Sequence, residues 1–176
     1  DTEVMLGLQY RMHTQIMAFS SEHFYENRLE AAPAVADHHL ADRPDEPLLY
    51  QPLTFIDTAG CGFEEVHNLE TLSRSNPGEA DLALRHLGMV LQHLQKPDPD
   101  LPDENTPTIG VISPYKDQVK YLRSTAHDYK PLWGWMKQMN IDTVDGFQGQ
   151  ERDIIYISIL NFQIASLRPL NTLKNT

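Results

Sequence analysis

The spacing of apolar residues predicts two helices in the first half of the chain. Residues 15–25 place Ile16, Phe19 and Phe24 between polar positions at helical intervals. A longer helix is predicted from Asn76-Pro77-Gly78-Glu79, which supplies an N-cap, a proline in the first turn and a glutamate three residues after the cap. Its apolar face is formed by Ala80, Ala83, Leu84, Leu87, Val90, Leu91 and Leu94.

Short apolar runs predict strands that alternate with the helices. These runs are residues 53–57, 108–112, 140–144 and 153–160. The second helix is expected to end at Lys96-Pro97, and another helix is predicted after Ser113-Pro114. Residues 31–52 and 98–107, rich in proline and aspartate, are predicted loops. The alternation indicates an α/β protein with a parallel sheet covered by helices on both faces.

Composition narrows the function classes. The chain has 176 residues, enough for one ordinary domain, and a formal net charge of −11. An acidic total argues against phosphate binding over a broad surface, but it leaves room for a narrow polar groove. No apolar run approaches the roughly 18 residues of a membrane span, and no targeting segment is expected at the start. The single cysteine, Cys61, excludes an internal disulfide and fits an intracellular protein.

Two segments are expected at the carboxyl edge of the sheet, where ligands of open parallel sheets bind. In Ser113-Pro114-Tyr115 the serine hydroxyl can cap the next helix, whose free N–H groups would favour a phosphate. An ordinary cap without a ligand is the alternative. In the segment 143–153, Gly146 and Gly149 permit tight turns among charged side chains. The alternative there is a solvated turn with a surface ion pair.

Other clusters are ambiguous from the residues alone. The run Gln9-Tyr10-Arg11-Met12-His13 contains either a phosphate clamp or a stacked surface arginine. The group Asp37, His38, His39 and Asp42 matches no tetrahedral metal template, so no metal site is predicted. Trp133-Gly134-Trp135 either stacks on bases or packs on the sheet. Nothing marks Cys61 as a nucleophile.

Taken together, these clusters resemble the motifs of superfamily 1 helicases of the up-frameshift type. Residues 6–13 with Phe19-Ser20-Ser21 and Phe24-Tyr25 resemble motif IV. Asn76 with Glu79-Ala80 resembles the start of that family's next helix, and residues 109–115 with Gln118-Val119 resemble its next motif. Residues 144–153 resemble motif V, which is the most specific of the set. The order and spacing agree from residue 6 to about residue 160.

The resemblance implies a RecA-like C-terminal helicase domain that faces a second RecA-like domain across an ATP site. By this likeness Arg11 would be an arginine finger, the catalytic residue, that reaches the γ-phosphate. The implied nucleotide-binding residues are Gln9, Tyr10, Gly149 and Glu151, with the last two on the ribose side. The implied contacts to the backbone of single-stranded RNA or DNA are Ser113, Pro114, Tyr115, Thr143 and Val144. ATP and Mg²⁺ are expected in the complete two-domain enzyme.

Departures from the family pattern limit what this chain is expected to do alone. Thr14 replaces the usual proline, with little expected effect, and the tail after Leu160 lacks the family's later arginine motif. The chain contains no Gly-x-x-x-x-Gly-Lys-Ser/Thr loop and no assignable metal carboxylates. We therefore expect a domain over residues 1–160, an atypical tail over 161–176, and no ATPase or unwinding activity without the N-terminal RecA-like domain.

The alternative is a degenerate helicase domain that serves as a nucleic-acid or protein scaffold. RNA and DNA, and a nuclear or cytoplasmic location, stay open. In the folded domain we expect Arg11, Ser113, Thr143 and Glu151 to lie along one edge of the sheet.

Overall fold

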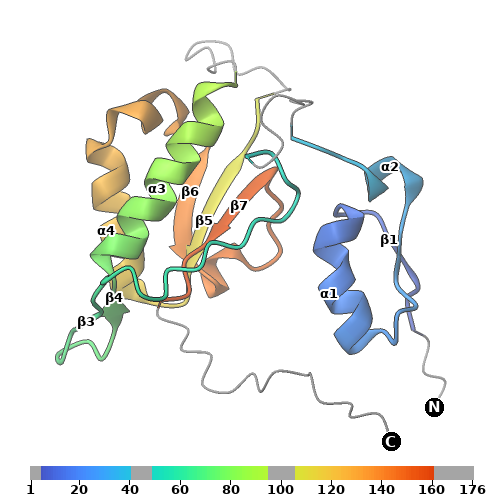
Figure 1. The fold of residues 1–176 in the computed structure, drawn as a ribbon, viewed down its shortest axis with the longest axis horizontal. Helices are drawn as coiled ribbons and strands as arrows, with labels where there is room; N and C mark the ends of the chain where they lie inside the picture. Colours follow the sequence, from blue (N-terminus) through green and yellow to red (C-terminus); the bar gives the residue numbers. More distant parts are fainter. Residues whose placement is uncertain (1–4, 41–48, 95–105, 161–176) are drawn as a thin grey trace, which may run out of the picture. The chain divides into compact units, whose positions relative to one another are not determined.

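A computed structural model describes residues 5–40, 49–94 and 106–160 of the chain. It divides into two compact units, residues 1–56 and residues 57–176, and each unit is treated by itself. Figure 1 shows the elements of both units. Across the described ranges, no helix has the length and apolar character needed to cross a bilayer. The predicted tail over residues 161–176 lies outside the described residues, so the limits of the domain and the tail stay a prediction.

The first unit packs two helices beside a small parallel pair of strands. Strand β1 (Leu8–Gln9) pairs with β2 (Glu30–Ala31), and the helices are α1 (Thr14–Phe24) and α2 (Pro33–Ala36). The predicted helix over residues 15–25 is therefore confirmed. Its apolar positions are nevertheless exposed, Phe24 at 70%, whereas Met17 and Ser21 are buried. The Ser21 hydroxyl donates to Leu29 O at 3.1 Å, so a polar contact lies on the buried side of α1.

The predicted strand over residues 53–57 is absent. These residues are coil, and Phe55 is 81% exposed. A strand forms only where a neighbour satisfies its backbone N–H and C=O groups, and no strand among the described residues pairs with this run. The predicted loop over residues 31–52 begins with the end of β2 and with α2, and its residues 41–48 lie outside the described part.

The second unit contains the predicted α/β sheet. Its three parallel strands are ordered β6 (Met139–Thr143), β5 (Ile109–Ser113) and β7 (Ile154–Ile157). The α-helices are α3 (Pro77–Gln92) and α4 (Lys116–Asp128), and the short 3-10 helices η1 (Lys130–Trp135) and η2 (Asp145–Phe147) lie in the connections. A two-stranded antiparallel hairpin, β3 (Val66–His67) with β4 (Arg74–Ser75), precedes α3. The predicted fold class and the strands near 108–112, 140–144 and 153–160 are confirmed.

Helix α3 begins as its sequence predicts. The Asn76 side chain accepts a hydrogen bond from Glu79 N at 3.1 Å, and Pro77 occupies the first turn. The helix ends at Gln92, earlier than the expected stop at Lys96-Pro97. Burial of its apolar stripe against α4 and the sheet forms much of the core, which includes Ala80, Leu84, Leu87, Leu91, Val119, Leu122 and Ala126.

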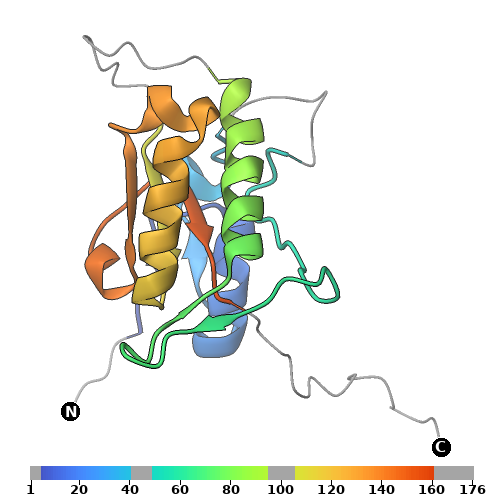
Figure 2. The same cartoon turned by 90° about the vertical axis from the view of Figure 1, so that its left-hand side faces the viewer.

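Both long helices cover the same face of the sheet (Figures 1 and 2). That face carries Val111 and Tyr156, which are partners in register, and His86 of α3 bonds Tyr156 there. On the opposite face Ile155 and Ile157 of β7 are exposed. The prediction of helices on both faces is therefore wrong for the described part of this unit. The crossover of residues 144–153 joins β6 to β7 with the 3-10 helix η2 and no α-helix, and its Phe147 and Arg152 cover part of the second face at Gly110.

Candidate functional site

The carboxyl edge of the sheet brings two predicted segments together. Ser113, the last residue of β5, is the register partner of Thr143, the last residue of β6. Pro114 and Val144 follow these two strand ends and are exposed, while Tyr115 and Thr143 are half-buried. The juxtaposition expected for Ser113 and Thr143 is confirmed, and the two turns form one continuous candidate surface.

The sequence predicted that the Ser113 hydroxyl caps the next helix, but the structure does not have this cap. Ser113 is completely buried, and its hydroxyl accepts a 3.4 Å hydrogen bond from Tyr115 N, inside the turn. The N-cap of α4 is Tyr115, which makes no side-chain capping bond. Because β5 runs one residue further than predicted, Ser113 belongs to the strand and lies before the helix cap. Its hydroxyl therefore shapes the turn, and the exposed surface is left to Pro114 and Tyr115.

The amino end of α4 is not open to a phosphate in the way that its sequence indicates. Asp117 N donates to Ser73 Oγ at 3.1 Å, so the β3–β4 hairpin occupies a first-turn donor. The Asp117 carboxylate accepts from Lys120 Nζ at 3.0 Å and from Thr71 Oγ1 at 2.9 Å, and these bonds hold the pKa of Asp117 below its usual range. The Asp117 carboxylate and the Ser73 hydroxyl thus lie at the positive end of α4, where the sequence predicted a bound phosphate.

The crossover after β6 depends on glycines for two different physical reasons. Gly149 has a φ of +78°, a conformation that favours glycine. At Gly146 a Cβ would lie 2.6 Å from the Asp142 carboxyl carbon, so a side chain there would require the Asp142 carboxylate to move. The buried Phe147 ring lies where a Cβ on Gly110 would be, 2.8 Å from Phe147 Cε1. The predicted tight turn is confirmed, and Phe147 holds it against β5.

Glu151 does not share the edge occupied by Ser113 and Thr143. The crossover returns to the amino ends of the strands, where Asp153 Oδ2 accepts from Thr108 N and from its hydroxyl, both at 2.7 Å. Two residues before Asp153, the Glu151 carbonyl accepts from Arg152 at 2.6 Å. The expectation of one common edge is wrong for Glu151, since a parallel crossover must carry the chain back across the sheet. Gly149 and Glu151 are both exposed on it.

The motif before α1 forms a turn built on the side chain of Gln9. Its Oε1 accepts from Arg11 N at 2.7 Å and from Met12 N at 2.9 Å, and its Nε2 donates to Met12 O at 2.7 Å. The Gln9 amide therefore holds the backbone of Arg11 and Met12 in the turn. The nucleotide contact that the family likeness implies for Gln9 stays a prediction. Tyr10 and Arg11 are exposed. His13 caps α1 by accepting from Gln15 N at 3.0 Å. The relation of Arg11 to Glu151 stays a prediction, because the two residues belong to different units.

Asn76, Gln118 and Ser158 form a buried polar network at the same carboxyl edge, and the sequence did not predict this network although it had marked Asn76 as a helix cap and Gln118 within a helicase-like motif. Gln118 hydrogen-bonds the backbone of Asn76 and the hydroxyl of Ser158. The available signal was a polar residue on the apolar face of a helix, since Gln118 shares its face with Leu122 and Ala126.

The other clusters named from the sequence are a possible metal group, the two tryptophans and Cys61. In the described part of the chain they show little sign of a binding or catalytic site. No group of three or more His, Cys, Asp or Glu side chains there could hold a metal ion. Trp135 is buried and packs in the core, whereas Trp133 is exposed and donates from Nε1 to His127 O at 2.7 Å. Cys61 is exposed.

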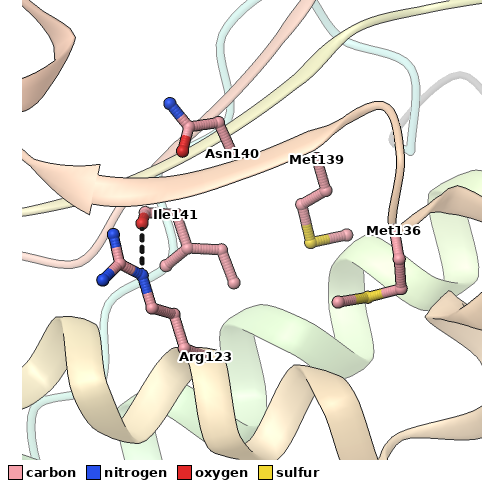
Figure 3. Close-up of a pocket in the computed structure, with 5 residues that line it drawn as sticks. All are labelled: Arg123, Met136, Met139, Asn140 and Ile141. Carbon is pink, nitrogen blue, oxygen red and sulfur yellow. Dashed lines mark hydrogen bonds between the residues drawn. The ribbon is translucent and has the colours of Figure 1, made fainter.

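A shallow hollow lies beside β6, away from the carboxyl edge (Figure 3). It is lined by Arg123, Met136, Met139, Asn140 and Ile141. Arg123 Nε donates to Ile141 O at 2.8 Å, which covers a backbone carbonyl of this edge strand. The lining contains no nucleophile or carboxylate, so the hollow is not a candidate active site.

The parallel sheet, the joined strand ends and the helices on one face agree with the fold of a RecA-like domain, and comparisons with known proteins give its class. Residues 1–165 match the family described as AAA domain. The rat DNA-binding protein SMUBP-2 is 37% identical over 160 residues, covering 89% of this chain and 15% of that protein. The DNA polymerase alpha-associated DNA helicase A of Saccharomyces cerevisiae is 35% identical over 170 residues, covering 91% of this chain and 23% of the yeast protein.

Helicase SEN1 of the same yeast is 35% identical over 159 residues, covering 88% of this chain and 6% of its own length. The chain belongs to this AAA domain family and, within it, to the superfamily 1 helicases of the up-frameshift type. It spans less than a quarter of the length of each of these three relatives.

Proposed function

We propose that the chain is the second RecA-like domain of an ATP-dependent helicase acting on single-stranded RNA or DNA, in the nucleus or cytoplasm. The observation that carries the proposal is the pairing of Ser113 with Thr143 at the carboxyl edge of the sheet. It joins the exposed Pro114 and Val144 into one surface, with Tyr115 beside them. Contacts from such turns to phosphate and sugar carry no base code, which fits movement along any sequence.

By the family likeness, Arg11, Gly149 and Glu151 would supply one half of an ATP site. Arg11 is exposed on a turn that Gln9 holds, and Gly149 and Glu151 are exposed on the crossover after β6. Arg11 would stabilise the charge on the γ-phosphate, and the crossover residues would contact the ribose side, as the family likeness implies. The described residues offer no metal-binding cluster and the sequence has no P-loop. Bound ATP with Mg²⁺ would supply the phosphoryl group, held mainly by the N-terminal RecA-like domain.

Such a half-site is expected to have no ATPase or unwinding activity alone, so strand binding is the property to test. The affinity of the chain for fluorescent single-stranded RNA and DNA is measured by anisotropy between roughly 50 and 200 mM salt. We expect weak binding that is similar for unrelated sequences. Val144→Glu, which adds a negative charge to a half-exposed position at the carboxyl edge, should weaken it about tenfold, because the charge repels phosphate.

The matched control is Ile155→Glu, which places the same charge at a similarly exposed position of β7. Ile155 is the register partner of Gly110, in the amino half of the sheet, so this variant should bind as the parent chain does. Equal weakening by both variants would show that only the total charge matters. An absence of binding at low salt would favour the scaffold function, with which the net charge of −11 and the occupied amino end of α4 agree.

A further inference from the structure

The first turn of α4 is held by a glutamine whose side chain is completely buried. Gln118 Oε1 accepts from Asn76 N at 2.8 Å, and its Nε2 donates to Asn76 O at 3.3 Å and to Ser158 Oγ at 3.0 Å. The amide therefore pairs with both backbone groups of Asn76, much as a neighbouring strand would. Removing one member of such a buried network leaves polar groups unpaired, which is costly in a low-dielectric interior.

Both partners of Gln118 belong to segments that meet the carboxyl edge of the sheet. Asn76 caps α3 through its side chain, which accepts from Glu79 N at 3.1 Å. Ser158 follows β7, and its N–H donates to Ile112 O at 2.9 Å, one residue before the end of β5. One side chain thus joins the start of α3, the start of α4 and the exit of β7.

The preceding residue holds the same turn from another direction. Asp117 N donates to Ser73 Oγ and the Asp117 carboxylate accepts from Thr71 Oγ1, so the β3–β4 hairpin is fastened to α4. Asp117 and Gln118 together fix the helix turn that immediately follows Pro114 and Tyr115. The turn that presents these two residues is therefore not a free loop, even though it lies at the surface.

We propose that Gln118 is a positioning residue for the single-strand site, which it serves by holding the Pro114-Tyr115 turn in its binding geometry. The inference rests on the proposed function. The residue type follows from the bonds: glutamate would lose the donors to Asn76 O and Ser158. An apolar residue would remove the acceptor for Asn76 N and one of the two donors to Asn76 O, which also accepts from Ala80 N at 3.1 Å. A turn held in place before binding gives up less conformational freedom when the strand arrives, and this favours affinity.

The test compares Gln118→Met and Ser158→Ala with Val90→Ala in the complete chain. Val90 is buried near the carboxyl end of α3, about 21 Å along the helix from Asn76, so its truncation lowers stability away from the edge. Unfolding in urea first gives the stability of each variant. Strand affinity is then measured where every variant is fully folded, and amide hydrogen exchange is followed at Asp117 and Val119.

We expect Gln118→Met to weaken strand binding about fivefold and Ser158→Ala to weaken it less, because it removes one bond of the network. Exchange at Asp117 and Val119 should accelerate in Gln118→Met by more than the loss of global stability explains. Val90→Ala should change neither property beyond its effect on global stability. Unchanged affinity in Gln118→Met, or equal weakening by Val90→Ala, would overturn the positioning role.

Failure of the parent chain to bind any strand would instead remove the proposed function. The exchange measurement separates the two cases, because it needs no ligand. Exchange in Gln118→Met that follows global stability alone would overturn the positioning role whatever the binding result.

Discussion

The contact between Gly110 and Phe147 gives the sharpest test of how the crossover is held on the sheet. A Cβ at residue 110 would lie 2.8 Å from Phe147 Cε1, 3.2 Å from Phe147 Cζ and 3.3 Å from Arg152 Cγ. Overpacking of this kind costs about 1–3 kcal/mol, and the gain from replacing a glycine in a strand offsets about 0.5–1 kcal/mol of it. Gly110→Ala should therefore destabilise the unit by up to about 2.5 kcal/mol.

A second substitution shows whether the ring itself is responsible. Phe147→Leu removes the ring edge that meets residue 110 and should cost about 1–2 kcal/mol, a part of the ~3–5 kcal/mol lost on complete truncation of a buried phenylalanine. The double variant Gly110→Ala/Phe147→Leu should be more stable than the sum of the single effects by about 1 kcal/mol, since the smaller side chain makes room for the new methyl group.

The assay is urea unfolding followed by tryptophan fluorescence. Both tryptophans of the chain, Trp133 and Trp135, lie in η1 of the second unit, so the signal reports the unit that contains the contact. If the two single effects add to within about 0.3–0.5 kcal/mol, the residues are not in contact and the account of the crossover fails. A stabilising Gly110→Ala would refute it as well.

Two further predictions concern the same unit. Gly149→Ala should destabilise it by about 1–2 kcal/mol through backbone strain alone, since φ is +78° and nothing lies within 4 Å of a new Cβ; Gly149→Asn should cost less in the same urea assay, and equal costs would contradict the strain. Burial lowers the pKa of His86, whose Nδ1 lies 2.6 Å from the Tyr156 hydroxyl. The unfolded chain therefore binds the proton more readily, and stability should fall as the pH drops below about 6.5. Urea titrations at several pH values should show a shallower fall for His86→Gln, and an identical fall would exclude His86 as the source.

The features that sequence predicted well are those fixed by neighbouring residues. The cap of α3 depends on Asn76, Pro77 and Glu79, which lie within one turn of one another, and the structure has this cap. Gly149 was expected in a tight turn, and its positive φ is a local property of the backbone. The pairing of Ser113 with Thr143 followed from one topological rule, because the carboxyl ends of parallel strands meet at one edge.

The features that sequence missed depend on partners far along the chain. Residues 53–57 have the composition of a strand, but strand formation needs a neighbour that composition does not supply. The bonds of Gln9 to Arg11 and Met12 were not predicted, because they depend on a turn geometry that is not visible in the sequence. The hydrogen bonds of Gln118 are the clearest case, since its partners lie about 40 residues away on either side of it, at Asn76 and Ser158.

The net charge of the chain and the occupied amino end of α4 both predict that strand binding involves few phosphate contacts. A helix amino end attracts phosphate through its free N–H groups. In α4 the Asp117 carboxylate lies in the first turn, and the Asp117 N–H already donates to the Ser73 hydroxyl. Among the residues at the carboxyl edge, Pro114, Tyr115, Thr143 and Val144 carry no positive charge, and the next cation is the exposed Lys116 at the start of α4. Contacts from them would therefore release few counterions.

The salt dependence of binding measures this directly. Each phosphate neutralised on a single strand contributes about −0.7 to the slope of log K against log salt, so one or two contacts predict a slope between about −0.7 and −1.4. A slope steeper than about −3 would require several cations at the strand, which this edge does not offer. The strand would then lie elsewhere on the chain, and the joined turns after β5 and β6 would not be its path.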